Sequence, residues 1–362
     1  MGKFTFHKSF QLNGVSFSSE EELLRYSRTI NVSVFSFLSE WFAKEDVVVV
    51  QTSGSTGKPK LIPLQKAYMV NSAKATGTFF DIQENTTALL CLSTDYIAGK
   101  MMLVRALVLG WKLDIVEAVS NPLRETNKHY DFSAMVPMQL QNSLKEIHQV
   151  KKLIVGGGAV SNELIKEIQN LPTAIFATYG MTETITHIAV KKLNNCASLT
   201  GGITNHPANK ENFHYKALPH VQLSQDNRNC LVIDAPKVAE ERIVTNDVVR
   251  LISTTSFEWL GRYDNVINSG GVKLHPEKIE EKLANIITHR FFVAGIPDKR
   301  LGERLILVVE GKENSVISNE VSNLAVLSKY EIPKEIYFIP KFIETATKKI
   351  QRKKTLAKIL PH

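Results

Sequence analysis

The sequence contains three cysteines among 362 residues, and these form neither a CxxC pair nor a spacing typical of a metal site. Cys91, Cys196 and Cys230 are scattered and odd in number, which argues against a disulfide framework and favours buried thiols in a reducing cytosol. No segment has the length and apolarity of a membrane span, and the first residues lack the apolar stretch of a signal peptide. Phe6 also stands where an N-myristoylation motif requires Ser or Thr. We therefore expect a cytoplasmic protein without a membrane partner.

The composition favours a large globular protein. Hydrophobic residues make up 43% of the chain, and a length of 362 residues suggests two or three domains. The formal net charge of +8 suits anionic partners such as nucleotides, coenzymes, nucleic acid or a membrane surface, but charge alone favours the plainer interpretation of a solvated, mildly basic surface. The basic C-terminal stretch lacks interleaved aromatic residues, so nucleic-acid binding is not expected.

Short β-branched runs alternate with helical periods, a pattern typical of an α/β fold with a largely parallel sheet. The predicted strands of this part are Val47–Val50, Ala88–Leu92, Leu113–Val116, Lys152–Val155 and Ala174–Thr178. The stretches Met101–Leu109 and Asn162–Gln169 are interpreted as amphipathic helices, and the runs 230–233 and 250–252 as antiparallel strands.

The pattern changes at GRYDNVINSGGVKLHPEKIEEKL, where glycines interrupt the chain and Pro276 suits the first position of a helix. Beyond it, FFVAGIPD and RLILVVEG read as a strand pair and IYFIP as a further strand. We expect a large N-terminal domain of mixed, largely parallel sheets with helices, residues 1–262, and a small α+β mobile C-terminal domain, residues 263–362.

The stretch TSGSTGKPK follows a valine-rich strand and is not a P-loop, because only two residues separate Gly54 from Gly57. The following KLIPL is β-like, so the unit reads as strand–loop–strand. Glycines permit close backbone approach, successive N–H groups form an anion-binding nest, and hydroxyls and lysines add donors. A polar hairpin turn is the plainer interpretation, but the dense pattern favours phosphate binding. The expected phosphate ligands are Thr52, Ser53, Gly54, Ser55, Thr56, Gly57 and Lys58.

This loop resembles the phosphate loop of the adenylate-forming superfamily of acyl-CoA synthetases, adenylation domains and luciferases. Further stretches resemble the superfamily's other motifs in the same order: VGGGAVSNEL, TYGMTET, TNDVV, GRYDNVINSGGVKLHPEKIE and TATKKIQRKK. Two positions depart from the pattern, since Asn246 replaces the glycine of the ribose motif and Lys348 that of the terminal motif. The resemblance covers nearly the whole chain and implies ATP, Mg²⁺ and CoA as cofactor and cosubstrates.

The resemblance also implies the site. It implies that adenine is bound by Gly157, Gly158, Ala159, Thr178, Tyr179 and Gly180. Thr182 is expected to contact a phosphate, Glu183 to bind magnesium, and Asp247 and Arg262 to bind the ribose. Asp264 is the expected domain hinge, and Lys349, Thr182 and Glu183 are the residues expected to catalyse adenylation. Each residue taken alone has a plain explanation, such as a core tyrosine, a solvated carboxylate or one charge in a basic tail. Only the ordered set favours the functional interpretation.

The stretch STDYIAGKMMLVRALVLG lies where many relatives carry Pro-x-x-His-x-x-Gly, with Tyr96 at the His position and Gly99 kept. Tyr96 suits an aromatic acid, and Lys100 and Arg105 suit a second carboxylate; a core helix with two snorkelling cations is about equally plausible. Together with MVPMQL and YGMTETITHIAV, this stretch is most similar to the o-succinylbenzoate–CoA ligases of menaquinone biosynthesis. That resemblance implies an o-succinylbenzoate-type CoA ligase.

Alternatives stay open at this point. Another small aromatic-acid CoA ligase, an enzyme that loads a carrier protein, and a nucleotide-binding sensor without turnover all fit parts of the pattern. Only a short segment precedes Val47, so part of the N-terminal subdomain is expected to be absent, which leaves the outer pocket walls and a homo-oligomer undecided.

Overall fold

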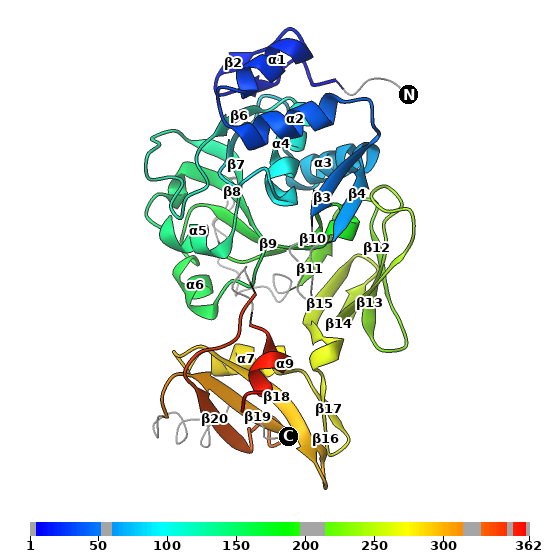
Figure 1. Ribbon diagram of the computed structural model, residues 1–362, viewed down its shortest axis with the longest axis vertical. Helices are drawn as coiled ribbons and strands as arrows, with labels where there is room; N and C mark the ends of the chain where they lie inside the picture. Colours follow the sequence, from blue (N-terminus) through cyan, green and yellow to red (C-terminus); the bar gives the residue numbers. More distant parts are fainter. Residues whose placement is uncertain (1–4, 52–59, 196–213, 314–326, 346–349, 360–362) are drawn as a thin grey trace.

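The computed structural model describes residues 5–51, 60–195, 214–313, 327–345 and 350–359. Its strands fall into one large sheet, a small second sheet and a hairpin. The large sheet ends at Arg262 and the second sheet begins at Ile267, and Figure 1 shows the second sheet below the first. The predicted division into domains 1–262 and 263–362 is compatible with this arrangement and stays a prediction. Within the described residues, no helix is long and apolar enough to cross a membrane.

Parallel strands form the centre of the large sheet. They are β1 (Gln11–Leu12), β5 (Thr87–Leu90), β6 (Lys112–Ile115), β7 (Tyr130–Met135), β8 (Val150–Val155) and β9 (Ala174–Gly180). Their aliphatic runs are buried on both faces, as expected for parallel strands covered by helices. The predicted central strands are confirmed to within a few residues, whereas β7 was not predicted.

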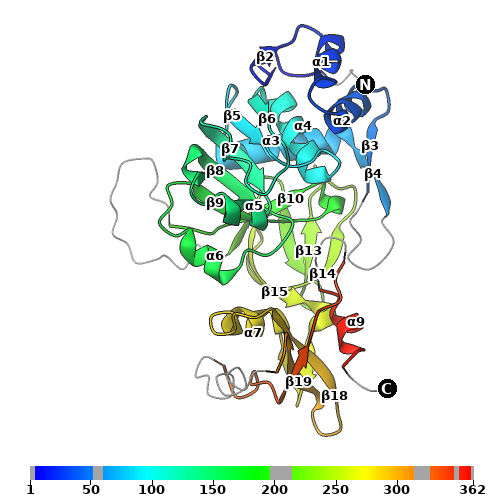
Figure 2. The ribbon, with the colours of Figure 1, turned by 60° about the vertical axis from the view of Figure 1, so that its left-hand side comes forward.

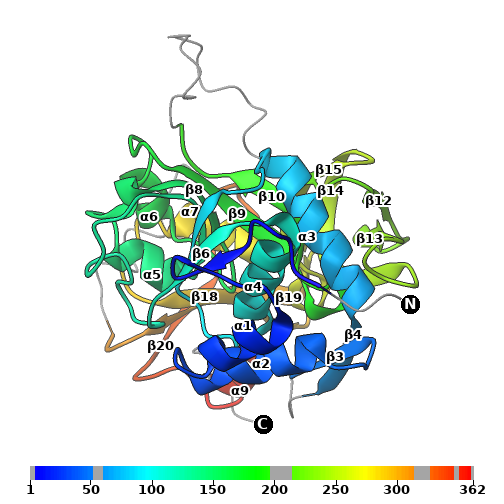
Figure 3. The same ribbon diagram turned by 90° about the horizontal axis from the view of Figure 1, so that it is seen from above.

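Four helices accompany these strands: α3 (Lys66–Phe80), α4 (Ile97–Leu109), α5 (Pro137–Asn142) and α6 (Asn162–Glu167). Figure 3 shows α3 and α4 side by side, and Leu109 of α4 packs against Gly77 of α3. The interpretation of Met101–Leu109 as amphipathic is wrong, because α4 is buried on every side from Gly99 to Leu107. A helix that is apolar all round belongs to a core.

The other half of the sheet is antiparallel: β10 (His187–Lys192), β11 (Tyr215–Ala217), β12 (Gln222–Gln225), β13 (Cys230–Asp234), β14 (Ile243–Ser253) and β15 (Ser256–Arg262). The strand order is β12-β13-β14-β15-β11-β10-β9-β8-β7-β5-β6-β1-β2, with β2 at Val15–Ser16. Antiparallel pairing of β13 with β14 confirms the prediction for those runs. The fold is thus α/β in its centre and antiparallel at one end.

The N-terminal segment covers the other end of the sheet. It contains α1 (Glu20–Ser27), capped by Ser19, and α2 (Val32–Phe42), capped by Asn31. The strands β3 (Val47–Gln51) and β4 (Leu61–Gln65) pair antiparallel on either side of residues 52–59. The predicted strands flanking the glycine-rich loop are therefore confirmed, while the loop itself lies outside the described residues.

The C-terminal unit has helices beside a five-stranded sheet, which confirms the predicted α+β class and three of the strands, whereas the first two strands of this unit were not predicted. The strands are β16 (Ile267–Ser269), β17 (Val272–Leu274), β18 (Phe291–Asp298), β19 (Gly302–Glu310) and β20 (Glu335–Ile339). Helix α7 (Pro276–Leu283) begins at Pro276, and α9 (Arg352–Leu356) lies near the chain end (Figure 2). Alternate residues of β18 and β19 belong to different hydrophobic clusters, so both faces of this sheet are covered.

Candidate functional site

Asp247 on β14 is the centre of a cluster drawn from three strands. The carboxylate is 7% exposed, and its Oδ2 accepts a hydrogen bond of 2.7 Å from the Tyr179 hydroxyl of β9. Its Oδ1 accepts one of 3.1 Å from Nε1 of Trp259, and Nη1 of Arg262 lies 3.5 Å from the same oxygen. The structure therefore brings together Tyr179, Asp247 and Arg262, three residues predicted for nucleotide binding.

Trp259, which no sequence motif marks, joins this cluster through a β-bulge. Asp247 pairs with Arg262 and Val249 with Trp259, and the register shifts between them. Without the bulge, residues three apart on a strand point to opposite faces. Since bulges have no dependable sequence signal, the only hint was an aromatic residue shortly before Arg262.

The Tyr179 ring is held in an aromatic group. Its centroid lies 5.0 Å from that of Phe257 in an edge-on arrangement, and Tyr215 stacks on the same phenylalanine at 5.2 Å. Burial, together with the neighbouring Asp247 charge, raises the pKa of Tyr179 far above its usual value. The phenol therefore remains a donor to Asp247 at any working pH.

Glycines allow the chain to approach closely near this cluster. Gly157 has φ +80°, a conformation that favours glycine. A Cβ at Gly180 would lie 2.2 Å from the carbonyl oxygen of Thr186, the residue just before β10. The Thr178 hydroxyl donates to the Val155 carbonyl at 3.2 Å, which ties β9 to the end of β8. These contacts give the predicted glycines a steric reason as well as the role the motif implies.

A cavity of about 780 Å³ lies between the large sheet and the C-terminal unit. Gly158, Ala159, Thr178 and Trp259 line it from the large unit, while residues of α7 and α9 line it from the other side. Tyr179, Asp247 and Arg262 are not among its lining residues; they contact its wall through Trp259. The predicted adenine-binding segments therefore face a cavity large enough for a nucleotide.

Polar contacts join the two units beside this cavity. Nζ of Lys278 on α7 lies 2.9 Å from Oε1 of Glu258 on β15, and Nδ2 of Asn162 donates to the Glu281 carbonyl at 2.7 Å. The predicted hinge residue Asp264 lies at the connection, where its Oδ2 accepts from Nδ2 of Asn246 at 3.4 Å. Asn246, the departure from the ribose motif, thus contacts the hinge residue directly.

The turn between β9 and β10 carries Thr182 and Glu183 and is strained. Ile185 has φ +65° and ψ −60°, and the Thr186 N–H donates to the Thr184 carbonyl at 2.7 Å, which defines a γ-turn. A β-branched residue rarely adopts positive φ, and such strain concentrates at functional sites. The Thr184 hydroxyl holds the turn through bonds to Met181 and Thr186. Glu183 is left exposed beside it.

The predicted acid-binding residues of α4 do not converge. Tyr96 is exposed at the start of the helix, and Gly99 is a packing residue whose Cβ would lie 2.2 Å from the Ser93 carbonyl oxygen. Nζ of Lys100 lies 4.7 Å from the centre of the Phe37 ring on α2, and burial lowers the pKa of Lys100. Lys100 and Arg105 therefore contact different parts of the protein, and their predicted role at a second carboxylate stays a prediction.

Arg105 is 1% exposed and has no carboxylate partner in the part of the chain that the structure describes. Its Nε donates to the Thr76 hydroxyl and its Nη2 to Nδ1 of His187 on β10, both at 3.4 Å. Burial lowers the pKa of Arg105 to about 9. His187 was not predicted as a site residue, because a single histidine in a strand carries no functional pattern.

Comparison with known proteins identifies the family. The model of the family described as "AMP-binding enzyme" matches residues 11–222, which are more than half of the 362 residues. The chain belongs to the AMP-binding enzyme family. The resemblance to adenylate-forming enzymes inferred from the motifs is thereby confirmed.

Other members of the family support the fold. A solved acyl-CoA synthetase (AMP-forming)/AMP-acid ligase II-like protein from Dyadobacter fermentans DSM 18053 is 36% identical, covers 91% of this chain and 94% of its own, and has a TM-score of 0.59. A solved o-succinylbenzoate CoA synthetase from Bacillus subtilis, in complex with ATP and magnesium ion, is 19% identical over 93% of this chain and 82% of its own, with a TM-score of 0.68. The predicted fold class is thus confirmed.

Among curated proteins, the 2-succinylbenzoate–CoA ligase of Lactococcus lactis subsp. lactis is 25% identical over 340 residues, which are 87% of this chain and 72% of that protein. The corresponding ligase of Enterococcus faecalis is 23% identical over 94% of this chain and 75% of its own.

Two groups of predicted site residues of this family lie outside the described residues. They are the phosphate loop residues Thr52 to Lys58 and the predicted catalytic Lys349. Their roles stay predictions.

Proposed function

We propose that this protein is an ATP-dependent carboxylate–CoA ligase that activates a small aromatic dicarboxylic acid, with o-succinylbenzoate as the leading candidate. Family membership supports the nucleotide chemistry, and the curated ligases for 2-succinylbenzoate are similar along most of their length. The observation that carries the proposal is the Asp247 cluster, in which residues 179, 247 and 262 meet beside a cavity of nucleotide size.

Asp247 suits a ribose. Each carboxylate oxygen accepts more than one hydrogen bond, and Tyr179 and Trp259 direct one donor at each oxygen. The remaining lone pairs can accept the two ribose hydroxyls, with Arg262 beside them. Gly158 and Ala159 then offer a flat wall to adenine. The donors hold the carboxylate in one orientation before the nucleotide arrives, which reduces the ordering cost of binding.

Glu183 fits a magnesium ion that is bound mainly by phosphate oxygens. Its exposed carboxylate has no ion-pair partner among the described residues, and no group of three His, Cys, Asp or Glu side chains that could hold a metal exists there. Mg²⁺ commonly uses one or two protein carboxylates together with substrate phosphates and water. When bound, the ion neutralises charge on the polyphosphate.

The proposed reaction has two steps. A carboxylate oxygen of the acid attacks the α-phosphorus of ATP, an acyl–AMP bond forms, and diphosphate leaves. The thiolate of CoA then attacks the acyl carbon, forms the thioester and expels AMP. In the first step an anion approaches a polyanion, so Thr182, the phosphate loop and Lys349 are assigned to offset that repulsion.

The burial of Arg105 supports the proposal that the substrate carries a second carboxylate. Removing a guanidinium from water without an opposite charge is costly, so a ligand that supplied a negative charge here would be stabilising. His187 and Thr76 provide hydrogen bonds but no negative charge. A dicarboxylic acid would offer one carboxylate to ATP and the other to Arg105.

The test is a panel of acids with ATP, Mg²⁺ and CoA, measured by diphosphate release and thioester formation. We expect o-succinylbenzoate to be adenylated far better than benzoate. Equal use of the two would exclude the diacid proposal while leaving the ligase proposal standing. Thioester formed only on a carrier protein, and not on free CoA, would identify a carrier-loading enzyme, and no diphosphate with any acid would favour a nucleotide sensor.

Lys349→Ala separates the two half-reactions. The change should nearly abolish adenylate formation, because the predicted lysine offsets charge only in that step. Given presynthesised acyl-AMP and CoA, the variant should still form thioester at close to the wild-type rate, since the C-terminal domain is proposed to have turned about Asp264 by then. Ile350, the next residue, lines the nucleotide cavity.

Lys348→Ala and Lys353→Ala serve as matched controls and should matter much less. Loss of both half-reactions in Lys349→Ala would contradict the domain rotation. Full adenylation in that variant would assign the role to a neighbouring lysine.

A further inference from the structure

The turn between β12 and β13 reaches the linker that joins the two units. Arg228 lies in this turn, and its guanidinium carbon is 5.1 Å from the centre of the Tyr263 ring. Tyr263 follows the last strand of the large sheet and begins the short helical turn Tyr263–Asn265. A cation at this distance over an aromatic ring is attracted to it. The large unit therefore contacts the first residue of the linker through a turn that is distant in the sequence.

The turn itself holds the Arg228 guanidinium in one direction. Nε donates to Oδ2 of Asp226 at 2.7 Å, and Oδ1 of Asp226 accepts from the backbone N–H groups of Arg228 and Cys230. Nη2 donates to the Thr245 carbonyl at 3.2 Å, and Nη1 donates to Oδ1 of Asn246 at 2.9 Å. A guanidinium presents its donors in a rigid fork, so these bonds fix its orientation.

Asn246 extends this set of contacts to the predicted hinge. Its Oδ1 accepts from Arg228, and its Nδ2 donates to Oδ2 of Asp264 at 3.4 Å. Because a guanidinium only donates and a carboxylate only accepts, this orientation of the amide is the one that satisfies both neighbours. A glycine, which the superfamily motif has at this position, has no side chain to make either bond. The departure from the motif therefore joins the β12–β13 turn to the linker.

We propose that Arg228 and Asn246 form a bridge that holds Tyr263 and Asp264 on the large unit and thereby favours the domain arrangement of this structure over a turned one. Both are positioning residues, since they act through the linker. In this arrangement Ile350 lines the cavity between the two units. Ile350 follows the proposed catalytic lysine, so the bridge favours adenylation and has to open before the domain turns. This kinetic consequence rests on the proposed function.

Amide hydrogen exchange of the full chain, without ligand, tests the bridge. The reporter is the Val266 N–H, which donates to the Tyr263 carbonyl at 3.1 Å and closes the linker turn. Asn246→Ala removes both bonds of the amide and should accelerate this exchange at least about threefold, as for the loss of weak exposed contacts. Unchanged exchange at Val266 would overturn the proposal.

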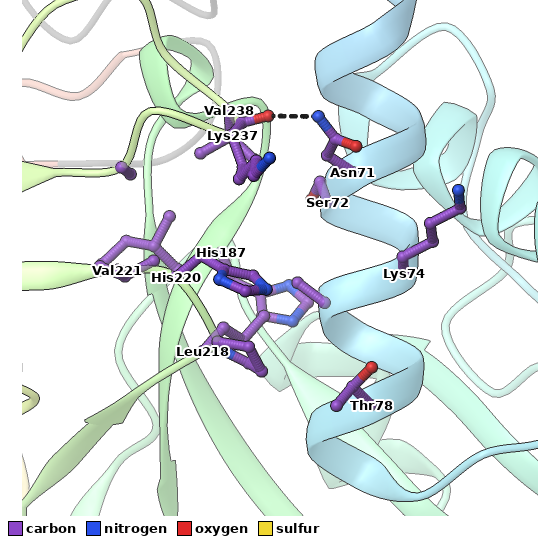
Figure 4. Close-up of a pocket in the computed structure, with 14 residues that line it drawn as sticks. Asn71, Ser72, Lys74, Thr78, His187, Leu218, His220, Val221, Lys237 and Val238 are labelled. Carbon is purple, nitrogen blue, oxygen red and sulfur yellow. Dashed lines mark hydrogen bonds between the residues drawn. The ribbon is translucent and has the colours of Figure 1, made fainter.

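Asn71→Ala is the matched control. Nδ2 of Asn71 donates to the Lys237 carbonyl at 2.8 Å and ties the loop between β13 and β14 to α3 (Figure 4). The variant removes an amide bond to the same β-hairpin without touching the linker. Exchange at Val266 should stay at the wild-type rate, and an acceleration equal to that in Asn246→Ala would contradict a specific bridge.

Exchanging donor and acceptor sharpens the test. Asn246→Asp keeps an acceptor for Arg228 but places a carboxylate against Asp264, so exchange at Val266 should rise at least about tenfold. The Asn246→Asp/Asp264→Asn double variant places an amide opposite the new carboxylate and leaves the net charge of the chain unchanged. It should bring the exchange back to within about threefold of the wild type. A double variant as fast as the single one would refute the contact between the two side chains.

The half-reactions test the positioning role. At saturating ATP, Asn246→Asp should slow adenylation at least about threefold and leave thioester formation from presynthesised acyl-AMP and CoA at the wild-type rate or faster. The double variant should recover adenylation. Equal loss of both half-reactions would refute the positioning role. The exchange experiment needs no substrate, so its result stands even if the chain activates no acid.

Discussion

Arg105 in the large unit is buried and Arg352 in the C-terminal unit is largely buried, but among the described residues only Arg352 has a carboxylate partner. Arg352 lies 2.7 Å from Oε1 of Glu280, donates to the Val293 carbonyl and covers the Phe292 ring. Arg105 is more deeply buried, and within the described part of the chain its hydrogen-bond partners are Thr76 and His187. The paired arginine joins α9 to α7 and thus serves the fold, whereas Arg105 has no carboxylate partner among the described residues, which is why we propose that it binds the second carboxylate of the substrate.

The largest effect is expected from Arg105→Met, which keeps most of the volume and removes the charge. Loss of the partner of a buried carboxylate costs about 2–5 kcal/mol, so kcat/KM for the dicarboxylic acid should fall at least about 30-fold. The free energy of unfolding should be unchanged or higher, because an unpaired buried charge disappears.

Steady-state kinetics with a diacid and a monoacid, together with denaturant unfolding, measure both quantities. A variant that loses stability but keeps its preference for the diacid would make Arg105 a structural residue like Arg352.

Arg352→Met should show the reverse pattern. It leaves Glu280 half-buried without its partner, and we expect a loss of about 2 kcal/mol in the free energy of unfolding. Burial already holds the pKa of Glu280 above its usual range, with Arg352 opposing that rise, so removing Arg352 raises it further. A carboxyl group whose folded pKa is raised loses stability as the pH increases through that pKa. The deficit should therefore be smaller near about pH 4 than near about pH 8.

Denaturant unfolding at the two pH values checks this, with the Glu280→Gln/Arg352→Met double variant as the control. The double variant should recover part of the stability at the higher pH. A deficit independent of pH would show that packing against Phe292, and not the ion pair, is what Arg352 contributes.

Arg262 is an intermediate case, 47% exposed and shared between Asp247 and Asp264. Arg262→Ala should change the free energy of unfolding by less than about 1 kcal/mol, as for other exposed ion pairs. Its proposed contact with the ribose predicts an increase of about tenfold in the KM for ATP. An unchanged KM for ATP, with altered interdomain motion instead, would assign Arg262 to the hinge alone.

The smallest effect is expected from Arg242→Ala. Its side chain is 73% exposed, and its partner Asp234 lies at 2.9 Å on the surface. Solvent screening limits such pairs, so the free energy of unfolding should change by less than about 0.5 kcal/mol and the kinetics not at all. A larger loss would mean that pairing with a carboxylate stabilises this fold regardless of burial. The difference between Arg105 and Arg352 could then no longer be attributed to burial.

Much of the fold follows from local pattern. The valine and leucine runs, the position of Pro276 and the alternation of strands and helices predicted the central sheet and the second sheet. Helix α4 was placed correctly but misread as amphipathic, because Lys100 and Arg105 imitate a polar face. In the structure one of these cations lies against Phe37 and the other against His187. Polarity along a sequence therefore does not report where a long side chain ends.

The candidate site likewise has residues that the sequence motifs predicted and residues that only the structure shows. The motifs identified Tyr179, Asp247 and Arg262, and the structure joins them. It also adds Trp259 and His187, which no motif marks. Trp259 reaches Asp247 because a bulge in β15 turns it to the same side as Arg262. His187 reaches Arg105 because a strained turn at Ile185 sets the start of β10.

The sequence by itself determined the family, the order of the elements and the chemical types of side chain available, since motifs and hydrophobic periods are local properties. The tertiary structure alone decided which of those side chains found partners. Whether a cation is neutralised depends on what distant strands and helices place within a few ångströms of it. That placement left Glu280 beside Arg352, and no carboxylate among the described residues beside Arg105.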